Sequence, residues 1–399
     1  MCTAYTEATP QQLLQGVAQA AVRWSGSVAA SKPGRAAVAG TTRTAYCGPV
    51  GEGERATGLQ RDRPVKQIRV HGPNDVRLDD VPSTLPGPRD ALVRMAACGI
   101  CGTDVSFVHM GGITGRPMVL GHEMAGVVEW AGTEVHGVAP GDRVIVYPAD
   151  EELGRLGSGA AEGGLTPFLL VREAAKGRRL FPVPDEMELR VAALAEPAAV
   201  GMQAVNQGEI APGDRVAVLG CGPIGLLAIA TLADRGIRDV VAVDTSQRRL
   251  EMAQQFGAAH VVNSLEADLW EQLARLHGTV PFMFGPTPAT DVFIEASGSD
   301  RLLGEVIEHG RYGGRMSLVA LHYAPVPTNF VQVLMKQFTI RGSFEYPPRF
   351  EDAIELLARH DLSDLITHSL PLEQFDEGLA LLEGSKECGK VMITFGSDE

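Results

Sequence analysis

A glycine-rich turn between a predicted strand and a predicted helix constrains this chain more than any other feature. The segment VAVLGCGPIG holds Gly220, Gly222 and Gly225 in the pattern G-x-G-x-x-G, with Ile224 inside it. These glycines permit a tight turn, and they let a pyrophosphate approach the free N–H groups at the positive end of the following helix. The turn therefore predicts a dinucleotide site, to which we assign these four residues.

The segments that follow alternate between strand-like and helix-like patterns. The runs DVVAV, AHVVN, DVFIEAS and GRMSLVAL are separated by runs of helical length. This alternation indicates a parallel sheet covered on both faces, with a surface loop over residues 279–290. Asp244 ends the second strand, where a carboxylate would bind the adenosine ribose and repel a 2′-phosphate, so NAD is predicted over NADP. Arg248 and Arg249 follow closely and keep NADP as an alternative.

The length of the chain, 399 residues, exceeds the roughly 250–300 residues at which a single core stops growing. Short strands and turns predict a barrel-like β unit that ends near residue 182, within a first domain over 63–200. The α/β pattern places the dinucleotide domain at 201–341, and we expect residues 342–399 to return to the first domain. Residues 1–62 are poor in core-forming residues and are expected to be a flexible extension.

Composition narrows the choice of ligands. The formal charge of −14 argues against nucleic acid and anionic membranes as partners. No apolar run approaches the roughly 18 residues that would predict a membrane span. The six cysteines are too few and too scattered for a disulfide scaffold, which favours the reducing cytoplasm. A small molecule, such as an alcohol or its ketone, is the expected substrate.

Residue types that bind zinc occur in the part of the chain before the glycine turn. Cys101 lies in CGICGTD, His122 lies in GHEMAG, and a later LAEP segment offers Glu196. Thiolate, imidazole and carboxylate are donors that zinc accepts, and a catalytic zinc keeps one of its four positions open for water or substrate. We hypothesise that these three residues bind one zinc ion. The alternative for the thiol, a redox pair with Cys98, rests on the C-x-x-C spacing alone.

Two neighbours of Cys101 could support such a site. Thr103 could hydrogen-bond the alcohol oxygen and pass its proton towards solvent, and Asp104 could orient His122, because metal-bound imidazoles usually need a partner for their second nitrogen. Both residues are also common in turns, which is the simpler explanation of their presence.

Together these motifs resemble the zinc-dependent alcohol and polyol dehydrogenases of the medium-chain dehydrogenase/reductase superfamily. The resemblance extends from about Lys66 to Phe395 through VRLDDVP, CGICGTD, GHEMAGVV, GDRV, LAEP, GDRVAVLGCGPIG, VDTSQRRLEMA and KVMI. It implies an α/β protein in which a GroES-like, β-rich catalytic domain is interrupted by a doubly wound Rossmann domain, with the active site between them. It also implies a homodimer or homotetramer, with the sheet edge near SLVAL as a plausible interface.

The resemblance assigns roles by motif position. Cys101 and His122 match zinc ligands, and Glu196 matches the third-ligand position, where binding is direct or through water. Glu123 matches a carboxylate that can approach the metal when ligands exchange. Arg249 matches a residue that often contacts the adenosine ribose. The catalytic set that follows from the resemblance is Thr103, Asp104 and Glu123.

Three departures from the family pattern stand out. The segment YPADEELGRLGSGAAEGG, over residues 147–164, lacks the four cysteines of a structural zinc site, so one zinc per subunit is expected. Ser106 occupies the place of a histidine that extends the proton relay, and His109 is its potential substitute. Glu345 stands where sorbitol dehydrogenases carry an arginine that binds polyols.

The function predicted from these observations is reversible hydride transfer between a secondary alcohol or diol and NAD, with zinc as the metal. Two alternatives stay open: a zinc-free reductase of the same superfamily, acting on an activated double bond, and a non-catalytic dinucleotide-binding protein with a vestigial metal site.

Overall fold

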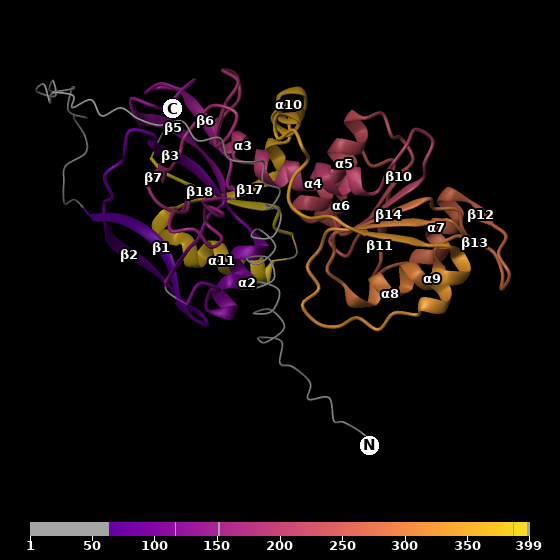
Figure 1. Ribbon diagram of the computed structural model, residues 1–399. Helices are drawn as coiled ribbons and strands as arrows, with labels where there is room; N and C mark the ends of the chain where they lie inside the picture. The colour runs from indigo at the N-terminus through magenta and orange to yellow at the C-terminus, as the bar shows by residue number, and fades with distance from the viewer. Residues whose placement is uncertain (1–63, 116, 151, 386, 397–399) are drawn as a thin grey trace, which may run out of the picture.

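The structure, a computed structural model, describes residues 64–115, 117–150, 152–385 and 387–396, which form two lobes side by side (Figure 1). One lobe holds the antiparallel strands of the first part of the chain together with its last strands. The other holds a parallel sheet flanked by helices. The predicted extension over residues 1–62 lies outside the described residues.

The second lobe is built on a six-stranded sheet in the order β11-β10-β9-β14-β15-β16, and every neighbouring pair is parallel. Its strands are β9 (Val216–Leu219), β10 (Val240–Asp244), β11 (His260–Asn263), β14 (Val292–Glu295), β15 (Arg315–Leu318) and β16 (Thr339–Gly342). The strand order reverses between β9 and β14. In such sheets ligands bind beyond the carboxyl ends of the strands at this switch point, which is where the glycine turn follows β9.

Helices cover this sheet, in agreement with the predicted alternation. They are α5 (Pro223–Asp234), α6 (Gln247–Gln255), α7 (Leu269–His277), α8 (Asp300–His309) and α9 (Phe330–Lys336). Helix α7 begins later than the pattern LEADLWEQLARLH suggests, because the Asp268 side chain caps its first turn by accepting from Glu271 N–H. The prediction of a surface loop over residues 279–290 missed one detail. Strands β12 (Thr279–Val280) and β13 (Thr287–Pro288) pair there as a short hairpin.

The first lobe contains a seven-stranded sheet in the order β17-β18-β3-β5-β6-β8, with β7 pairing on β3, and a three-stranded sheet in the order β2-β1-β4. The strands are β1 (Pro64–Gly72), β2 (Asp75–Pro82), β3 (Ala91–Ile100), β4 (Met118–Val119), β5 (Glu123–Ala131), β6 (Arg143–Val146), β7 (Phe168–Val171), β8 (Leu180–Pro182), β17 (Ile366–Pro371) and β18 (Lys390–Thr394). Strand β18 pairs antiparallel with β3. The end of the chain therefore returns to the first lobe, as predicted.

A continuous helix joins the two lobes. Helix α4 (Ala195–Gln207) passes through residue 200, where the sequence pattern placed a boundary, and it packs against α5 and α10 (Glu351–Arg359). One buried apolar cluster includes Ala125 of the first lobe, Ala198 of this helix and Val218 of the parallel sheet. The lobes thus share a core, which fixes their relative placement.

The free edge of the parallel sheet differs from the expected one. SLVAL begins in β15, which is paired on both sides, so that strand is interior. The edge strand beyond β15 is β16, whose four residues are all exposed. In the part of the chain that the structure describes, no helix combines the length and the apolar character needed to cross a bilayer.

Candidate active site

The register between β3 and β5 brings the metal-binding candidates together. Gly99 lies opposite Glu123 in this antiparallel pair, Cys101 directly follows β3, and His122 directly precedes β5. One donor atom each from Cys101, His122 and Glu123 lies within 4.8 Å of the other two, and the imidazole and the carboxylate are buried. Residues more than 20 positions apart along the chain therefore converge because two strand ends meet.

Two glycines make room for this arrangement. A Cβ on Gly99 would lie 1.9 Å from Glu123 Oε2. Gly121, which precedes His122, has a φ of 93°, and a Cβ there would lie 2.6 Å from the backbone nitrogen of Leu165. A side chain at Gly99 would displace the Glu123 carboxylate, and at Gly121 the left-handed conformation together with the close backbone approach favours glycine.

Asp104 links the two halves of the site. Cys101 is the N-cap of α2 (Gly102–Met110), and its N–H donates to Asp104 Oδ2 at 2.9 Å, while Asp104 Oδ1 lies 3.6 Å from His122 Nδ1. Burial raises the pKa of Asp104, although the nearby imidazole opposes this shift. Burial alone would lower the pKa of His122, but the negative charges of Asp104 and Cys101 raise it well above its usual value. Because Nδ1 faces Asp104, Nε2 is the nitrogen that remains for a metal.

Lys390 is a site residue that sequence reasoning missed. Its ammonium group donates to Glu123 Oε1 at 2.6 Å and to the carbonyl of Ile100 at 3.3 Å. Glu123 is fully buried and Lys390 nearly so. Burial lowers the pKa of Lys390, but the pairing with Glu123 outweighs it and the net shift is upward. The available signal was a lysine at the start of the otherwise apolar KVMI strand, where a buried charge requires a partner.

Glu196 occupies a different place from Glu123. It lies in the first turn of α4, outside the close group of three donors, and its Oε1 accepts a hydrogen bond from the Tyr346 hydroxyl at 2.7 Å. Burial raises the pKa of Glu196 to about 7. The structure thus gathers Glu123, rather than the predicted Glu196, with the thiol and the imidazole. Tyr346 is a second residue that sequence reasoning did not assign to the site.

The donor set fits zinc. A thiol, an imidazole and a carboxylate match the ligand types that zinc accepts. Three buried side-chain atoms in the site have no hydrogen-bond partner, namely Asp104 Oδ1, His122 Nδ1 and Glu123 Oε2. An unpartnered carboxylate oxygen in a buried place is costly unless a cation or a donor meets it. The Glu123 Oε2 atom is therefore consistent with a metal ion between the three side chains.

Close contacts explain two of the glycines in the turn after β9. Gly220 has a φ of 94°, and a Cβ there would lie 2.7 Å from the backbone of Ser297. A Cβ on Gly225 would lie 1.9 Å from the carbonyl oxygen of Gly220. A Cβ on Gly222, the N-cap of α5, would meet no atom within 4 Å, so the space beside this residue is open. Ile224, in the first turn of α5, is half-buried.

Asp244 holds the turn to the end of β10. Its Oδ2 accepts from Cys221 N–H at 2.7 Å, and its Oδ1 accepts from the N–H groups of Thr245 and Ser246. The carboxylate thereby stands beside the glycine turn, where the ribose was predicted. Arg249 instead donates to the carbonyl of Cys388, from Nη2 at 2.8 Å and from Nε at 3.1 Å, so in this structure it links the two lobes. Its contact with a ribose stays a prediction.

Comparisons with known proteins agree with this geometry. The family model described as Alcohol dehydrogenase GroES-like domain matches residues 87–185, and the one described as Zinc-binding dehydrogenase matches residues 223–359. Human sorbitol dehydrogenase is 33% identical, over 78% of this chain and 93% of its own length. The chain belongs to the zinc-dependent alcohol and polyol dehydrogenases.

Solved structures support the same membership. The 2R,3R-butanediol dehydrogenase of Bacillus subtilis is 28% identical and superposes with a TM-score of 0.73, over 83% of this chain and all (100%) of that one. A candidate zinc-binding dehydrogenase of Sinorhizobium meliloti 1021, bound to NADP, is 25% identical with a TM-score of 0.73, over 83% of this chain and 99% of its own. This dehydrogenase is accordingly an oxidoreductase with a GroES-like domain and a Rossmann domain, as the sequence predicted.

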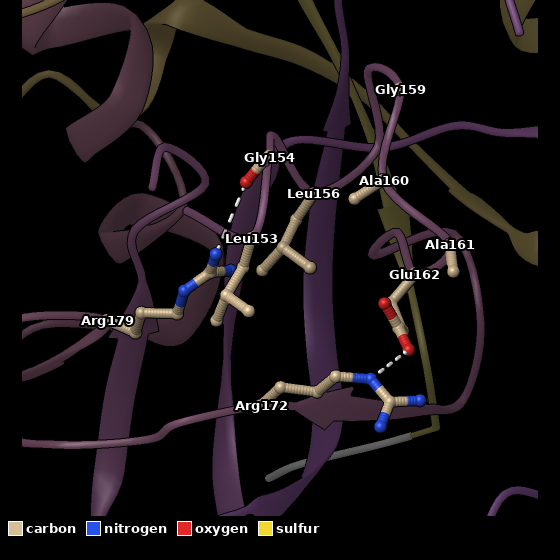
Figure 2. A pocket seen from close by; sticks show the side chains of 9 residues that line it. All are labelled: Leu153, Gly154, Leu156, Gly159, Ala160, Ala161, Glu162, Arg172 and Arg179. Carbon is tan, nitrogen blue, oxygen red and sulfur yellow. Dashed lines mark hydrogen bonds and ion pairs between the residues drawn. The ribbon is translucent and has the colours of Figure 1, made fainter. Parts of the chain in front are cut away.

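In this dehydrogenase the described part of the segment 147–164, which has no cysteine, packs near His122. Arg172 Nε donates to Glu162 at 2.8 Å, and the buried Arg179 donates from Nη2 to the carbonyl of Gly154 at 3.2 Å (Figure 2). The same segment packs on the turn before His122, because a Cβ on Gly157 would lie 2.0 Å from the carbonyl oxygen of Gly121. Arginine contacts thus hold a loop that braces the His122 turn.

His109, the potential substitute for the histidine that Ser106 replaces, is held by other partners in this dehydrogenase. Thr103 is half-buried in the first turn of α2, and the Ser106 hydroxyl donates back to the carbonyl of Gly102 at 3.1 Å. His109 contacts Asn74 Oδ1 through Nδ1 at 2.7 Å and Glu383 through Nε2 at 2.5 Å. Both ring nitrogens are therefore engaged elsewhere, and His109 does not take the place that Ser106 leaves.

Proposed function

We propose that this protein oxidises a secondary alcohol or a diol with NAD and one bound zinc ion per subunit, and that it catalyses the reverse reduction. The observation that carries the proposal is the close group of donor atoms from Cys101, His122 and Glu123, of which the imidazole and the carboxylate are buried. The names of its relatives, sorbitol dehydrogenase and butanediol dehydrogenase, support a hydroxylated substrate.

Each of the site residues has a separate role in the proposed reaction. Cys101, His122 and one of the two carboxylates, Glu123 or Glu196, would hold the zinc ion. Bound zinc supplies Lewis acidity that lowers the pKa of an alcohol, and the nicotinamide supplies the hydride acceptor. Thr103 hydrogen-bonds the substrate hydroxyl and transfers its proton towards solvent. Asp104 holds His122 in one orientation throughout.

Metal and activity together test this proposal. Purified protein should contain about one zinc ion per chain by elemental analysis, and a panel of secondary alcohols, diols and polyols should reduce NAD, as followed by its absorbance. Chelation should remove activity and added zinc should restore it. Protein without stoichiometric zinc, or full activity after complete metal removal, would contradict the proposal.

The cofactor preference can be tested at Asp244. Replacing Asp244 by asparagine removes the negative charge that repels a 2′-phosphate, so kcat/KM with NADP should rise and kcat/KM with NAD should fall, each by about tenfold, or about 1.4 kcal/mol. The matched variant Arg248→Met, in which a half-exposed guanidinium is lost, should lower only the efficiency with NADP. A clear preference of the unaltered protein for NADP would refute the role given to Asp244.

We also propose a homodimer through the free edge of β16 and the adjoining helix α9. Edge strands present unpaired N–H and C=O groups that a second copy can continue. The apolar side chains Phe330, Val331 and Leu334 of this helix are 72%, 62% and 76% exposed. Phe330 and Leu334 are four positions apart and lie on one side of the helix, and an exposed apolar surface of this kind favours an interaction site.

Light scattering after size exclusion tests the dimer. Leu334→Glu should convert it to a monomer at micromolar concentration, because the charge would be buried in the interface. Leu265→Glu is the matched control, since Leu265 is equally exposed at 73% but lies outside this surface. If Leu334→Glu and the unaltered protein have the same mass, the interface lies elsewhere.

A further inference from the structure

We infer that an ion pair between Arg155 and Glu345 acts as a clasp that holds Tyr346 on Glu196, and so positions that carboxylate in the active site. Arg155 belongs to the segment 147–164, whereas Glu345 lies just beyond β16, where the chain leaves the parallel sheet. The inference rests on the proposed function, because it concerns a carboxylate placed near the metal donors. It assigns a positioning role to Arg155 and Glu345.

The backbone at Glu345 needs external support. Its φ is 60°, in the left-handed region that residues other than glycine seldom adopt. Residues held in such conformations persist where surrounding contacts compensate for the strain. The preceding side chain, Phe344, is 71% exposed and cannot anchor the segment through burial.

Arg155 supplies that support with two contacts. Its Nη2 atom forms an ion pair with Glu345 Oε1, and its guanidinium carbon lies 5.5 Å from the centroid of the Phe344 ring. One side chain thus binds two consecutive residues, through charge and through a cation–π contact. The loop at Arg155 is folded back on itself, since the Arg155 carbonyl accepts from the N–H groups of Ser158 and Ala160.

The clasp acts on the metal site through the next residue. Tyr346 directly follows Glu345, its hydroxyl donates to Glu196 Oε1 at 2.7 Å, and its ring packs edge-on against Tyr147 with centroids 5.2 Å apart. A change in the φ of Glu345 would move the phenol, and hydrogen bonds weaken steeply when distance or angle departs from the optimum. Among the described residues the Tyr346 hydroxyl is the donor that contacts the Glu196 carboxylate, so losing it would release that carboxylate.

The expected loss of activity distinguishes this positioning role from a simple contribution to stability. The Arg155 and Glu345 side chains are 41% and 31% exposed, and ion pairs at such positions contribute little to overall stability. Partners that orient residues around a metal, in contrast, change metal affinity or activity about 10- to 100-fold when they are removed. The clasp should therefore affect activity much more than the melting temperature.

A double-mutant cycle tests the clasp. Arg155→Met keeps the aliphatic stem over Phe344 and removes the charge, and it should lower kcat about tenfold or more while the KM for NAD stays unchanged. Tyr346→Phe should cause a similar loss, and the double variant should lose no more than Tyr346→Phe alone. Exchanging the charges, with Arg155→Glu and Glu345→Arg together, should recover most of the activity. Independent, multiplying losses in the double variant would overturn the clasp.

Hydrogen exchange gives a measurement that does not depend on zinc or substrate. Arg155→Met should speed the exchange of backbone amides in residues 343–350, in zinc-free as well as zinc-loaded protein. The control is Arg178→Met, in which an arginine of comparable exposure, 46%, loses its contacts with Asp150 and Glu152. It should leave exchange in this segment unchanged.

The two measurements keep the clasp separate from the proposed function. A protein that lacks zinc and dehydrogenase activity but shows faster exchange in Arg155→Met would refute the proposed function and leave the clasp standing. Unchanged exchange in that variant would overturn the clasp even in an active enzyme.

Discussion

Serine in place of Cys101 should remove both the bound zinc and the oxidation of alcohols. A serine hydroxyl stays protonated at neutral pH and is a poor zinc ligand, whereas thiolate is among the donors that zinc prefers. We expect less than stoichiometric zinc after dialysis and a fall in kcat/KM of at least about 1000-fold, or about 4 kcal/mol. Elemental analysis and steady-state kinetics on the same preparation measure both effects.

Cys98→Ser is the matched control for this prediction. Cys98 is fully buried and lies outside the close group of donors, with its Sγ directed at the carbonyl of Gly99 at 3.8 Å. A serine hydroxyl can donate to the same carbonyl, so the variant should keep its zinc and its activity. Equal loss in both variants would mean that the C-x-x-C spacing, rather than Cys101 alone, matters for the metal.

The parts of the fold that could be predicted are those that local patterns encode. The G-x-G-x-x-G turn identified β9 and α5, because steric limits on φ and the approach of a phosphate act within ten residues. The alternation of strands and helices identified the parallel sheet for a similar reason. The edge of that sheet was misplaced, because the pattern could not show that FTIRGSF adds β16 beyond SLVAL.

The parts of the site that could not be predicted depend on contacts between distant residues. Lys390 and Glu123 are 267 positions apart, and Tyr346 and Glu196 are 150 positions apart. No spacing or periodicity connects such residues. The first contact requires β18 to return and pair with β3 beside β5, and the second requires the segment after β16 to reach helix α4. The sequence also could not show which carboxylate, Glu123 or Glu196, lies closer to the thiol and the imidazole. That depends on the register of β3 with β5 and on the placement of α4.

The buried pair of Lys390 and Glu123 leads to the second large expected effect. Lys390→Met keeps most of the volume of the side chain but leaves the fully buried Glu123 carboxylate without its cation. Removing one partner of a buried ion pair destabilises proteins by about 3–5 kcal/mol, because the remaining charge cannot be solvated. We expect a loss of this size in the free energy of unfolding of the zinc-free protein, measured by guanidinium denaturation with a chelator present.

Two further variants identify the cause of that loss. Lys390→Met combined with Glu123→Gln should recover most of the stability of the zinc-free protein, because a neutral amide needs no counter-charge. Lys66→Met breaks the exposed pair with Glu373 and should change stability by no more than about 1 kcal/mol. Saturating zinc should reduce the loss in Lys390→Met, because a ligand that binds only the folded state stabilises it. A zinc-free Lys390→Met protein as stable as the unaltered one would show that the pair of Lys390 and Glu123 does not stabilise the fold.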